Sequence, residues 1–252
     1  GTGTTWSTRY TDKFIMDRNL GAASADRAQG VDNTAGLYYQ YGRKDPVPAS
    51  NVVLYDGNGV ALPRYHNDAD CISRITGRVS IKTAVSYPYY FYRGNAEWMA
   101  GTNPYVANLW NNPAAGTGKS LFDPCPPGWR LPVNGTWNTF TLAGHVPNAN
   151  AANNSAVNPG ATIDYKGYTD QAGWDFYLSG SSGATAFYPA TGFRDSANTG
   201  ANVNKQITAY CWLATPYGVA GYGLCLYCTP NTVGSSSTSY RGHGLPTRCI
   251  QE

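Results

Sequence analysis

Short runs of aromatic and β-branched residues, separated by clusters of Gly, Pro and Asn, dominate this chain of 252 residues. Runs of this kind are typical of β-strands, whereas the three- and four-residue spacing of an amphipathic helix is scarce. Phe14–Met16 is predicted to be a strand that ends at the turn-prone segment 19–21. The apolar aromatic run 36–41 precedes a charged turn, and Pro46 ends the element before it.

The pattern from residue 186 onward is that of further strands. Predicted strands cover residues 187–188, 192–194, 210–214, 223–227 and 244–250. The loop 215–222 contains Pro and Gly and suits a hairpin between two of these strands. That hairpin would bring Cys211 near Cys225, which leaves a cross-strand disulfide as an open alternative.

The best candidate for a helix is the segment 135–143. Asn134 can cap its amino end, and Trp137 and Phe140 lie three residues apart on one face. Because the helix is short, we expect tertiary packing to hold it.

Two segments are expected to be irregular. The stretch 47–122 has its sharpest turn signal at 56–59, and stretches of this length are usually functional or contain short elements of their own. The polar tract 148–158 is expected to be a surface loop. The sequence has no internal repeat and no clear domain boundary, and its length is compatible with one large domain or two small ones.

The composition narrows the class of protein. Charged residues make up 13% of the chain, against about 25% in an average soluble domain, while there are 20 Tyr and 7 Trp. This balance suits exported proteins that meet sugars or other polymers, and it also suits a plain loop-rich β protein. The net charge of +3 forms no basic stripe, so nucleic acid is not an expected partner. No run approaches the ~20 apolar residues that cross a membrane, so membrane insertion by this segment is not expected.

The six cysteines fit an oxidising compartment. Cys225 and Cys228 form a C-x-x-C motif, which suggests a redox or zinc site. In a strand, however, an offset of three residues places the two sulfurs on opposite faces. The chain has no second C-x-x-C and no paired histidines to complete a zinc site. We therefore expect no metal and no cofactor.

Four groups of residues carry a family likeness. They are Ile15–Ala22, Gly36–Pro46, Asp123–Pro132 followed by Trp137, and Gly192–Arg194 leading to Cys211-Trp212 and the terminal Arg248-Cys249. In this order they resemble the Fibrobacter succinogenes major paralogous domain family, in the version found in surface proteins and pilus-tip adhesins of Bacteroides-type gut bacteria. The likeness spans nearly the whole chain. It therefore implies one domain over residues 1–252, the C-terminal part of a longer exported surface protein.

The same segments resemble, more weakly, the formylglycine-generating sulfatase-modifying enzymes. The similarity lies in the segment 130–132 with Trp137 and in the terminal Arg-Cys, while 134–136 replaces the acidic residue usual before the Trp. Those enzymes have a C-type-lectin-like fold. The resemblance therefore implies an α+β fold with a small twisted antiparallel sheet, few short helices and long loops, and it does not imply their chemistry.

The motif residues are expected to have structural roles. Prolines hold the segment 124–132 extended, and Trp129 and Trp137 are expected to be large anchors because aromatic side chains are mostly buried. Asp17 and Arg18 are expected to form a buried pair that satisfies loop amides, with a ligand contact as the alternative.

The family resemblance also implies a disulfide between Cys125 and Cys249, which would link the middle of the chain to its end. Because the loop that it closes is long, the bond would contribute about 4 to 5 kcal/mol in the loop-entropy model.

The expected function is non-catalytic binding at the cell surface. The ligand surface is expected on the aromatic-rich stretch, whose candidate residues are Tyr87, Tyr89, Tyr90, Tyr92, Trp98, Tyr105 and Trp110. Exposed rings gain contact energy on sugar or peptide faces, although for any single ring burial in a core beneath the loop is the commoner outcome. The expected partner is a glycan or protein ligand, with pilus subunits as further partners. A structural pilus cap without a soluble ligand is the alternative.

Catalysis is not expected. His66, His145 and His243 lie in polar or loop sequence without the motifs that surround a catalytic histidine. An oxidase of the formylglycine-generating type is the remaining enzyme interpretation, and the C-x-x-C spacing argues against it. Calcium-dependent sugar binding is not expected, because the segment 109–112 has no acidic partner beside it.

Overall fold

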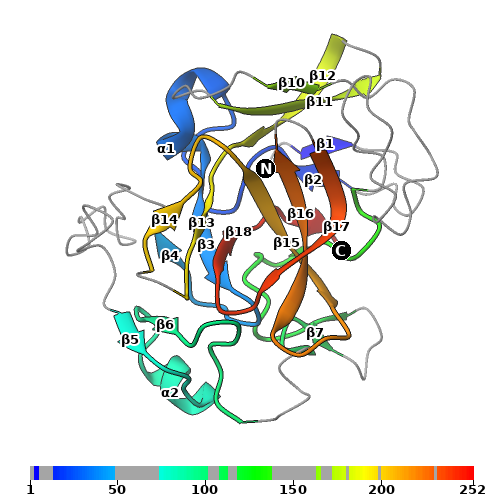
Figure 1. The fold of residues 1–252 in the computed structure, drawn as a ribbon. Coiled ribbons are helices and arrows are strands. Elements are labelled where there is room, and N and C mark those ends of the chain that lie inside the picture. Colours follow the sequence, from blue (N-terminus) through cyan, green and yellow to red (C-terminus); the bar gives the residue numbers. More distant parts are fainter. Residues whose placement is uncertain are drawn as a thin grey trace, which may run out of the picture.

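The computed structural model describes residues 3–5, 14–48, 74–101, 108–112, 118–137, 163–165, 172–179, 182–197, 200–229 and 232–252. Within these residues the chain is mostly antiparallel β-sheet with short helices, as Figure 1 shows. This agrees with the expected α+β class with few short helices. The helical elements are η1 (Arg27–Gln29), α1 (Gly30–Thr34) and α2 (Ile81–Ser86).

A four-stranded sheet joins the two ends of the chain to its proline-rich middle. Its order is β1 (Gly3–Thr5), β2 (Phe14–Met16), β19 (Ile250–Gln251) and β9 (Trp129–Arg130). Ile250 lies opposite Ile15 on one side and opposite Arg130 on the other, so β19 is an inner strand. The disulfide between Cys125 and Cys249 is present, which confirms the pairing implied by the resemblance.

A five-stranded sheet brings together three regions that are far apart in the sequence. Its order is β14 (Asn202–Val203), β13 (Phe193–Arg194), β18 (Gly244–Pro246), β3 (Leu37–Gln40) and β4 (Val47–Pro48). Leu245 pairs with Tyr39 across β18 and β3, and both side chains belong to one buried cluster.

The longest strands form two three-stranded meanders. One contains β15 (Ala209–Pro216), β16 (Tyr222–Thr229) and β17 (Thr232–Tyr240), and the other contains β10 (Ile163–Tyr165), β11 (Gly173–Ser179) and β12 (Ser182–Pro189). In Figure 1 the second meander lies at the top and the first in the centre. The remaining described strands are the parallel pair β5 (Arg74–Thr76) and β6 (Phe91–Arg93), and the pair β7 (Asn111–Asn112) and β8 (Gly118–Lys119).

The β15–β17 sheet lies between two clusters of buried side chains. One cluster contains Cys211 and Cys228, and the other contains Trp212 and Cys225. This arrangement confirms that Cys225 and Cys228 lie on opposite faces. Trp212, and not Cys211, lies opposite Cys225, so the cross-strand disulfide is not formed and all three cysteines of this sheet are free and buried.

The prediction of a single final strand over 244–250 is wrong. These residues form β18 and β19, which belong to different sheets. Between them the side chain of Arg248 is buried and donates from Nη2 to the carbonyl oxygen of Phe187, at 2.6 Å. The need to bury and satisfy this arginine interrupts the extended run.

The strand β17 is absent from the sequence prediction. Its sequence is rich in Ser and Thr and lacks apolar alternation, and its pairing with β16 is what makes it a strand. Strand formation here depends on the neighbouring strand more than on intrinsic preference.

The predicted helix at 135–143 is only partly described. Its described part, 135–137, belongs to a turn that starts at Asn134. The rest of it lies outside the described residues, as do the turn at 56–59 and the tract 148–158. Trp137 is fully buried, as expected of an anchor, and its indole N–H donates to the hydroxyl of Tyr188 at 2.8 Å.

Candidate functional site

The proline-rich segment before β9 is a scaffold held by internal polar contacts. The carboxylate of Asp123 accepts from the backbone N–H groups of Cys125 and Leu131, at 2.8 and 2.9 Å. The ammonium group of Lys119 donates to the carbonyl oxygens of Cys125 and Trp129, at 2.5 and 2.6 Å. The ring of Trp129 is partly buried against the cluster beneath it. These contacts support the expected structural role of the segment.

Asp17 and Arg18 form the expected pair, but the structure does not bury it. The two side chains form an ion pair at 2.9 Å, but they are 27% and 38% exposed. The buried polar residue of this motif is Asn19, which donates to the carbonyl oxygen of Ala35 and accepts from Nε of Arg248. Asn19 is the better anchor because its short amide fills donor and acceptor needs at no charge cost.

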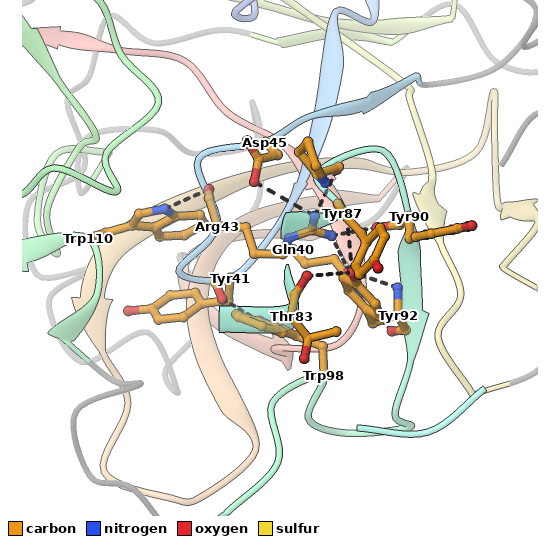
Figure 2. A network of polar contacts seen from close by, with 11 residues as sticks. Gln40, Tyr41, Arg43, Asp45, Thr83, Tyr87, Tyr90, Tyr92, Trp98 and Trp110 are labelled. Atoms are coloured by element: carbon orange, nitrogen blue, oxygen red, sulfur yellow. Dashed lines mark hydrogen bonds and ion pairs between the residues drawn. The ribbon is translucent and has the colours of Figure 1, made fainter. Parts of the chain in front are cut away.

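A buried arginine lies beneath the predicted aromatic surface (Figure 2). The guanidinium group of Arg43 donates to Oε1 of Gln40 and to the carbonyl oxygens of Pro88 and Tyr90, at 2.7 to 2.9 Å. It also lies over the ring of Tyr92, 4.9 Å from the centroid. Burial lowers the pKa of Arg43. The arginine thus fixes the backbone that carries the exposed tyrosines.

Three of the predicted ligand-binding residues are core residues. Tyr92, Trp98 and Trp110 are at most 1% exposed. The indole N–H of Trp98 donates to the carbonyl oxygen of Tyr41, and that of Trp110 donates to the carbonyl oxygen of Arg43. These rings therefore cannot face a ligand, because they fill the space around Arg43.

The exposed part of the predicted surface is small. Tyr87 and Tyr89 are 47% and 48% exposed, and the partly buried ring of Tyr90 lies between them, with centroids 5.9 and 4.8 Å away. Tyr105 lies outside the described residues. Tyr87 and Tyr89 thus form an exposed pair that Arg43 supports from below.

A longer series of aromatic contacts involves the central strands, and we call it the aromatic ladder. It is a row of rings in which each centroid is 4.6 to 6.5 Å from the next. In order along the row, its members are Tyr217, Tyr222, Tyr240, His243, Phe193, Tyr210 and Tyr227. All of them are at least partly exposed, and Tyr217 is 41% exposed. They come from β13, β15, β16, β17 and the connections beside them.

Hydrogen bonds between the hydroxyls hold the ladder rings in place. The side chains of Tyr222 and Tyr240 are hydrogen-bonded to each other, which raises the pKa of Tyr222. Burial raises the pKa of Tyr210, and its side chain is hydrogen-bonded to that of Tyr227. Rings that are linked in this way lose less conformational freedom on binding than separate exposed rings would.

His243 lies in the middle of the ladder as a neutral imidazole. Its Nδ1 accepts from the backbone N–H of Ser196 at 3.1 Å and lies 3.7 Å from the carboxylate of Asp195. Burial lowers the pKa of His243 to about 4, and the carboxylate of Asp195 opposes that shift. The proton therefore lies on Nε2, which has no hydrogen-bond partner among the described residues.

The neighbourhood of Ser196, His243 and Asp195 lacks the geometry of a catalytic triad. A triad needs the serine on one imidazole nitrogen and the carboxylate on the other. Here both approach Nδ1, and that nitrogen already accepts from a backbone amide. The hydroxyl of Ser196 donates to the carbonyl oxygen of Asn95 at 2.5 Å.

A groove of about 830 Å³ lies beside the disulfide, between the segment after β8 and the carboxyl-terminal residue. Its inner polar groups are used within the protein: Asn111 donates to a carbonyl oxygen, and Lys119 and Asp123 bind the proline-rich segment. The exposed charges at its rim, Lys44 and Glu252, have opposite signs.

Part of the ladder could be found from the sequence. The hairpin predicted between 210–214 and 223–227 is enough to place Tyr210 opposite Tyr227, as the structure has them. Tyr222 meets Tyr240 only through β17, which the sequence does not predict. Phe193 joins from β13 of another sheet and His243 from the turn between β17 and β18, and no local sequence signal predicts either contact.

Within the described residues, no group of three or more His, Cys, Asp or Glu side chains is placed to hold a metal ion. His66, His145 and Cys71 lie outside that part of the chain. No helix in the described ranges is both long enough and apolar enough to span a bilayer. No family model, no curated protein and no solved structure matches the chain.

Proposed function

We propose that this chain is a non-catalytic binding module with a C-type-lectin-like fold, exported to the cell surface, where it takes part in adhesion. Its ligand is a glycan or a protein, and its main contact surface is the aromatic ladder. The observation that carries the proposal is the continuous row of partly exposed rings, from Tyr217 to Tyr227.

A row of partly exposed rings suits a binding surface. Large exposed apolar patches on soluble proteins mark binding surfaces more often than chance. Tyrosine is favoured at such surfaces because it combines a large apolar face with a hydroxyl and has few rotatable bonds. The ladder contains five tyrosines, and their hydroxyls are partly held by one another.

The family resemblance supports the surface location. The matching segments resemble domains of surface proteins and pilus-tip adhesins, and the disulfide between Cys125 and Cys249 suits an oxidising environment. The exposed pair Tyr87 and Tyr89 remains a second candidate contact from the same proposal.

A structural pilus cap is the second candidate function. It is favoured by an exposed apolar patch at the end of α2, formed by Val85, Tyr87 and Tyr89, which are 47% to 57% exposed. A patch of this kind suits docking to a neighbouring subunit.

The test compares binding by the wild-type protein and by three double variants, on a glycan array and in pull-downs with surface proteins. Tyr222→Ala with Tyr240→Ala interrupts the ladder, Tyr87→Ala with Tyr89→Ala removes the exposed pair, and Phe14→Ala with Leu121→Ala is the control at exposed apolar positions. We expect the ladder variant to bind at least tenfold more weakly and the control to bind like wild type. No binding by wild type in either assay, or equal binding by the ladder variant, would contradict the proposal.

A further inference from the structure

We propose that the groove beside the disulfide is the contact surface of a symmetric dimer of this chain, in which Leu121 of each copy inserts into the groove of the other. This inference goes beyond the proposed binding function and does not depend on it. It is carried by the exposure of Leu121, by the apolar lining of the groove and by two opposite charges at its rim.

Leu121 is the most exposed of the large apolar residues that the structure describes. It is 90% exposed, whereas the others of this class are 41% to 57% exposed. A single exposed leucine is ordinary on a protein surface, but Leu121 lies at a groove that is large enough to receive such a side chain. Insertion removes this apolar surface from water, which is favourable.

The turn that carries Leu121 is held in place by its neighbours. The hydroxyl of Ser120 donates to the carbonyl oxygen of Leu109, and it accepts from the backbone N–H of Phe122 at 3.0 Å. The backbone N–H of Asp123 donates to the carbonyl oxygen of Ser120 at 3.3 Å. Because this backbone is fixed, little conformational freedom is left to lose when Leu121 binds.

The lining of the groove suits an apolar side chain. The groove has a volume of about 830 Å³, and Leu109 and Phe122 contribute apolar surface to it. Two of its polar groups are already engaged, because Lys119 donates to three carbonyl oxygens and Asp123 accepts from two backbone N–H groups. Neither group needs a polar ligand, so a leucine enters the groove at little desolvation cost.

The two exposed charges at the rim lie on different sides of the groove. Lys44 lies on the side of β7, because the carbonyl oxygen of Arg43 accepts from the indole of Trp110. Glu252 lies on the side of β9, because its backbone N–H donates to the carbonyl oxygen of Gly128 at 3.0 Å. The groove therefore carries a positive charge on one side and a negative charge on the other.

Opposite charges on one surface suit a two-fold symmetric dimer. In such a dimer, a contact between one residue and a second residue of the partner is matched by the reverse contact. Lys44 of each copy then faces Glu252 of the other. Within its own copy Glu252 lies 3.7 Å from Lys119, and a pair as exposed as this one contributes little and leaves Glu252 available. A second copy thus matches this surface in both its apolar and its charged parts.

The experiment measures the mass of the full chain in solution by sedimentation equilibrium. Concentrations run from about 1 µM to about 1 mM, which covers the dissociation constants of weak dimers. We expect a monomer–dimer equilibrium whose dissociation constant rises with salt, because salt screens the two charge pairs.

Substitutions at exposed apolar residues test the insertion. Leu121→Asp should raise the dissociation constant at least tenfold, because each substitution acts twice in a symmetric dimer. Val219→Asp, the same kind of change at a residue that is 51% exposed and lies outside the groove, should leave the constant unchanged. Circular dichroism checks that every variant is folded.

Charge exchange tests the symmetric pairing. Lys44→Glu alone and Glu252→Lys alone each place like charges opposite each other at both contacts, so each should raise the dissociation constant about tenfold. The two substitutions in one chain restore opposite charges and should return the constant to within about threefold of the wild-type value. An equal mixture of the two single variants should also form dimers, because their charges complement each other.

The outcomes separate this inference from the proposed function. None of the ladder residues lines the groove, and neither Tyr87 nor Tyr89 does, so the Leu121→Ala control of the binding test keeps both proposed contact surfaces. A monomer at every concentration, or equal dimerisation by wild type and Leu121→Asp, overturns the dimer and leaves the binding function standing. A double charge exchange that does not restore dimers overturns the symmetric pairing. Dimers that form while wild type binds no ligand support this inference and contradict the proposed function.

Discussion

The side chain of Arg43 shows what a single buried cation does in this protein. Its two terminal nitrogens donate to Gln40 and to the carbonyl oxygens of Pro88 and Tyr90. Replacing Arg43 by Ala leaves buried acceptors without donors, so we expect the free energy of unfolding to fall by about 3 kcal/mol. Urea denaturation measures this loss. Arg18→Ala, at a partly exposed ion pair, should cost about 0.5 kcal/mol or less, and equal losses for the two variants would contradict the role of Arg43.

His243 makes stability depend on pH. Burial lowers its folded-state pKa to about 4, against 6.5 for the unfolded chain. The unfolded state therefore takes up the proton first, and the contribution of the neutral ring, complete above pH 6.5, is lost as the pH falls from 6.5 to about 4. The loss should reach about 3 kcal/mol.

The measurement compares the wild-type protein with His243→Gln at pH 7 and pH 4.5. Burial raises the pKa of Glu97 and of Asp123, which changes stability in the opposite direction, but both carboxyls are present in the two proteins and cancel in the difference. We expect the wild-type protein to lose more unfolding free energy than the variant between the two pH values. The same loss in both would show that His243 does not titrate in this range.

At the scale of the elements, β16 depends on a glycine that has no room for a side chain. A Cβ at Gly223 would lie 2.4 Å from Cδ2 of Tyr41 and 3.1 Å from Cζ3 of Trp212. Gly223→Ala should therefore cost about 1 to 3 kcal/mol of overpacking, seen as a lower thermal midpoint. Gly218→Ala, in the hairpin loop with no atom within 4 Å of the added Cβ, should be neutral or slightly stabilising. A similar effect of both substitutions would contradict this.

The elements differ in how strongly the local sequence specifies them. The strand at Phe14–Met16 and the hairpin of β15 and β16 were predictable because apolar runs are bounded there by turn residues. The split of 244–250 and the strand β17 were not, because a buried Arg248 and the pairing with β16 decide them. Both causes are tertiary, and neither leaves a local pattern.

The sequence predicted that the candidate site is aromatic, but it did not predict which residues form it. The tyrosine-rich composition indicated an aromatic surface. Which rings are buried depends on how the chain packs around Arg43, and the sequence does not distinguish this arginine from one on the surface. Tyr92, Trp98 and Trp110 are buried in this packing, while the ladder assembles from strands that only the fold brings together.

At the scale of the whole molecule, the disulfide between Cys125 and Cys249 joins residues 124 positions apart. Reduction, or Cys125→Ala with Cys249→Ala, should lower the free energy of unfolding by about 4 to 5 kcal/mol in the loop-entropy model, measured by urea denaturation. An unchanged denaturation midpoint after complete reduction would contradict this. The loop-entropy model attributes the effect to the unfolded chain, so the native sheets should keep their circular dichroism.

The free cysteines of the central sheet should be inert in the folded protein. Cys211, Cys225 and Cys228 are fully buried, and burial raises the pKa of Cys211 to about 12. We expect iodoacetamide to leave these three unmodified until urea unfolds the chain, because the thiolate is the reacting species. Mass spectrometry of the labelled peptides decides this, and labelling of any of the three under native conditions would count against the buried arrangement.

The inner position of β19 has a consequence for how the protein is made. A ribosome releases the residues of this strand after everything else that the structure describes, yet β2 and β9 can flank each other only once it lies between them. Until β19 is synthesised, the edges of β2 and β9 stay unpaired, and unpaired strand edges can form non-native pairs with other chains. The sheet of β1, β2, β19 and β9 can therefore close only after β19 has been synthesised.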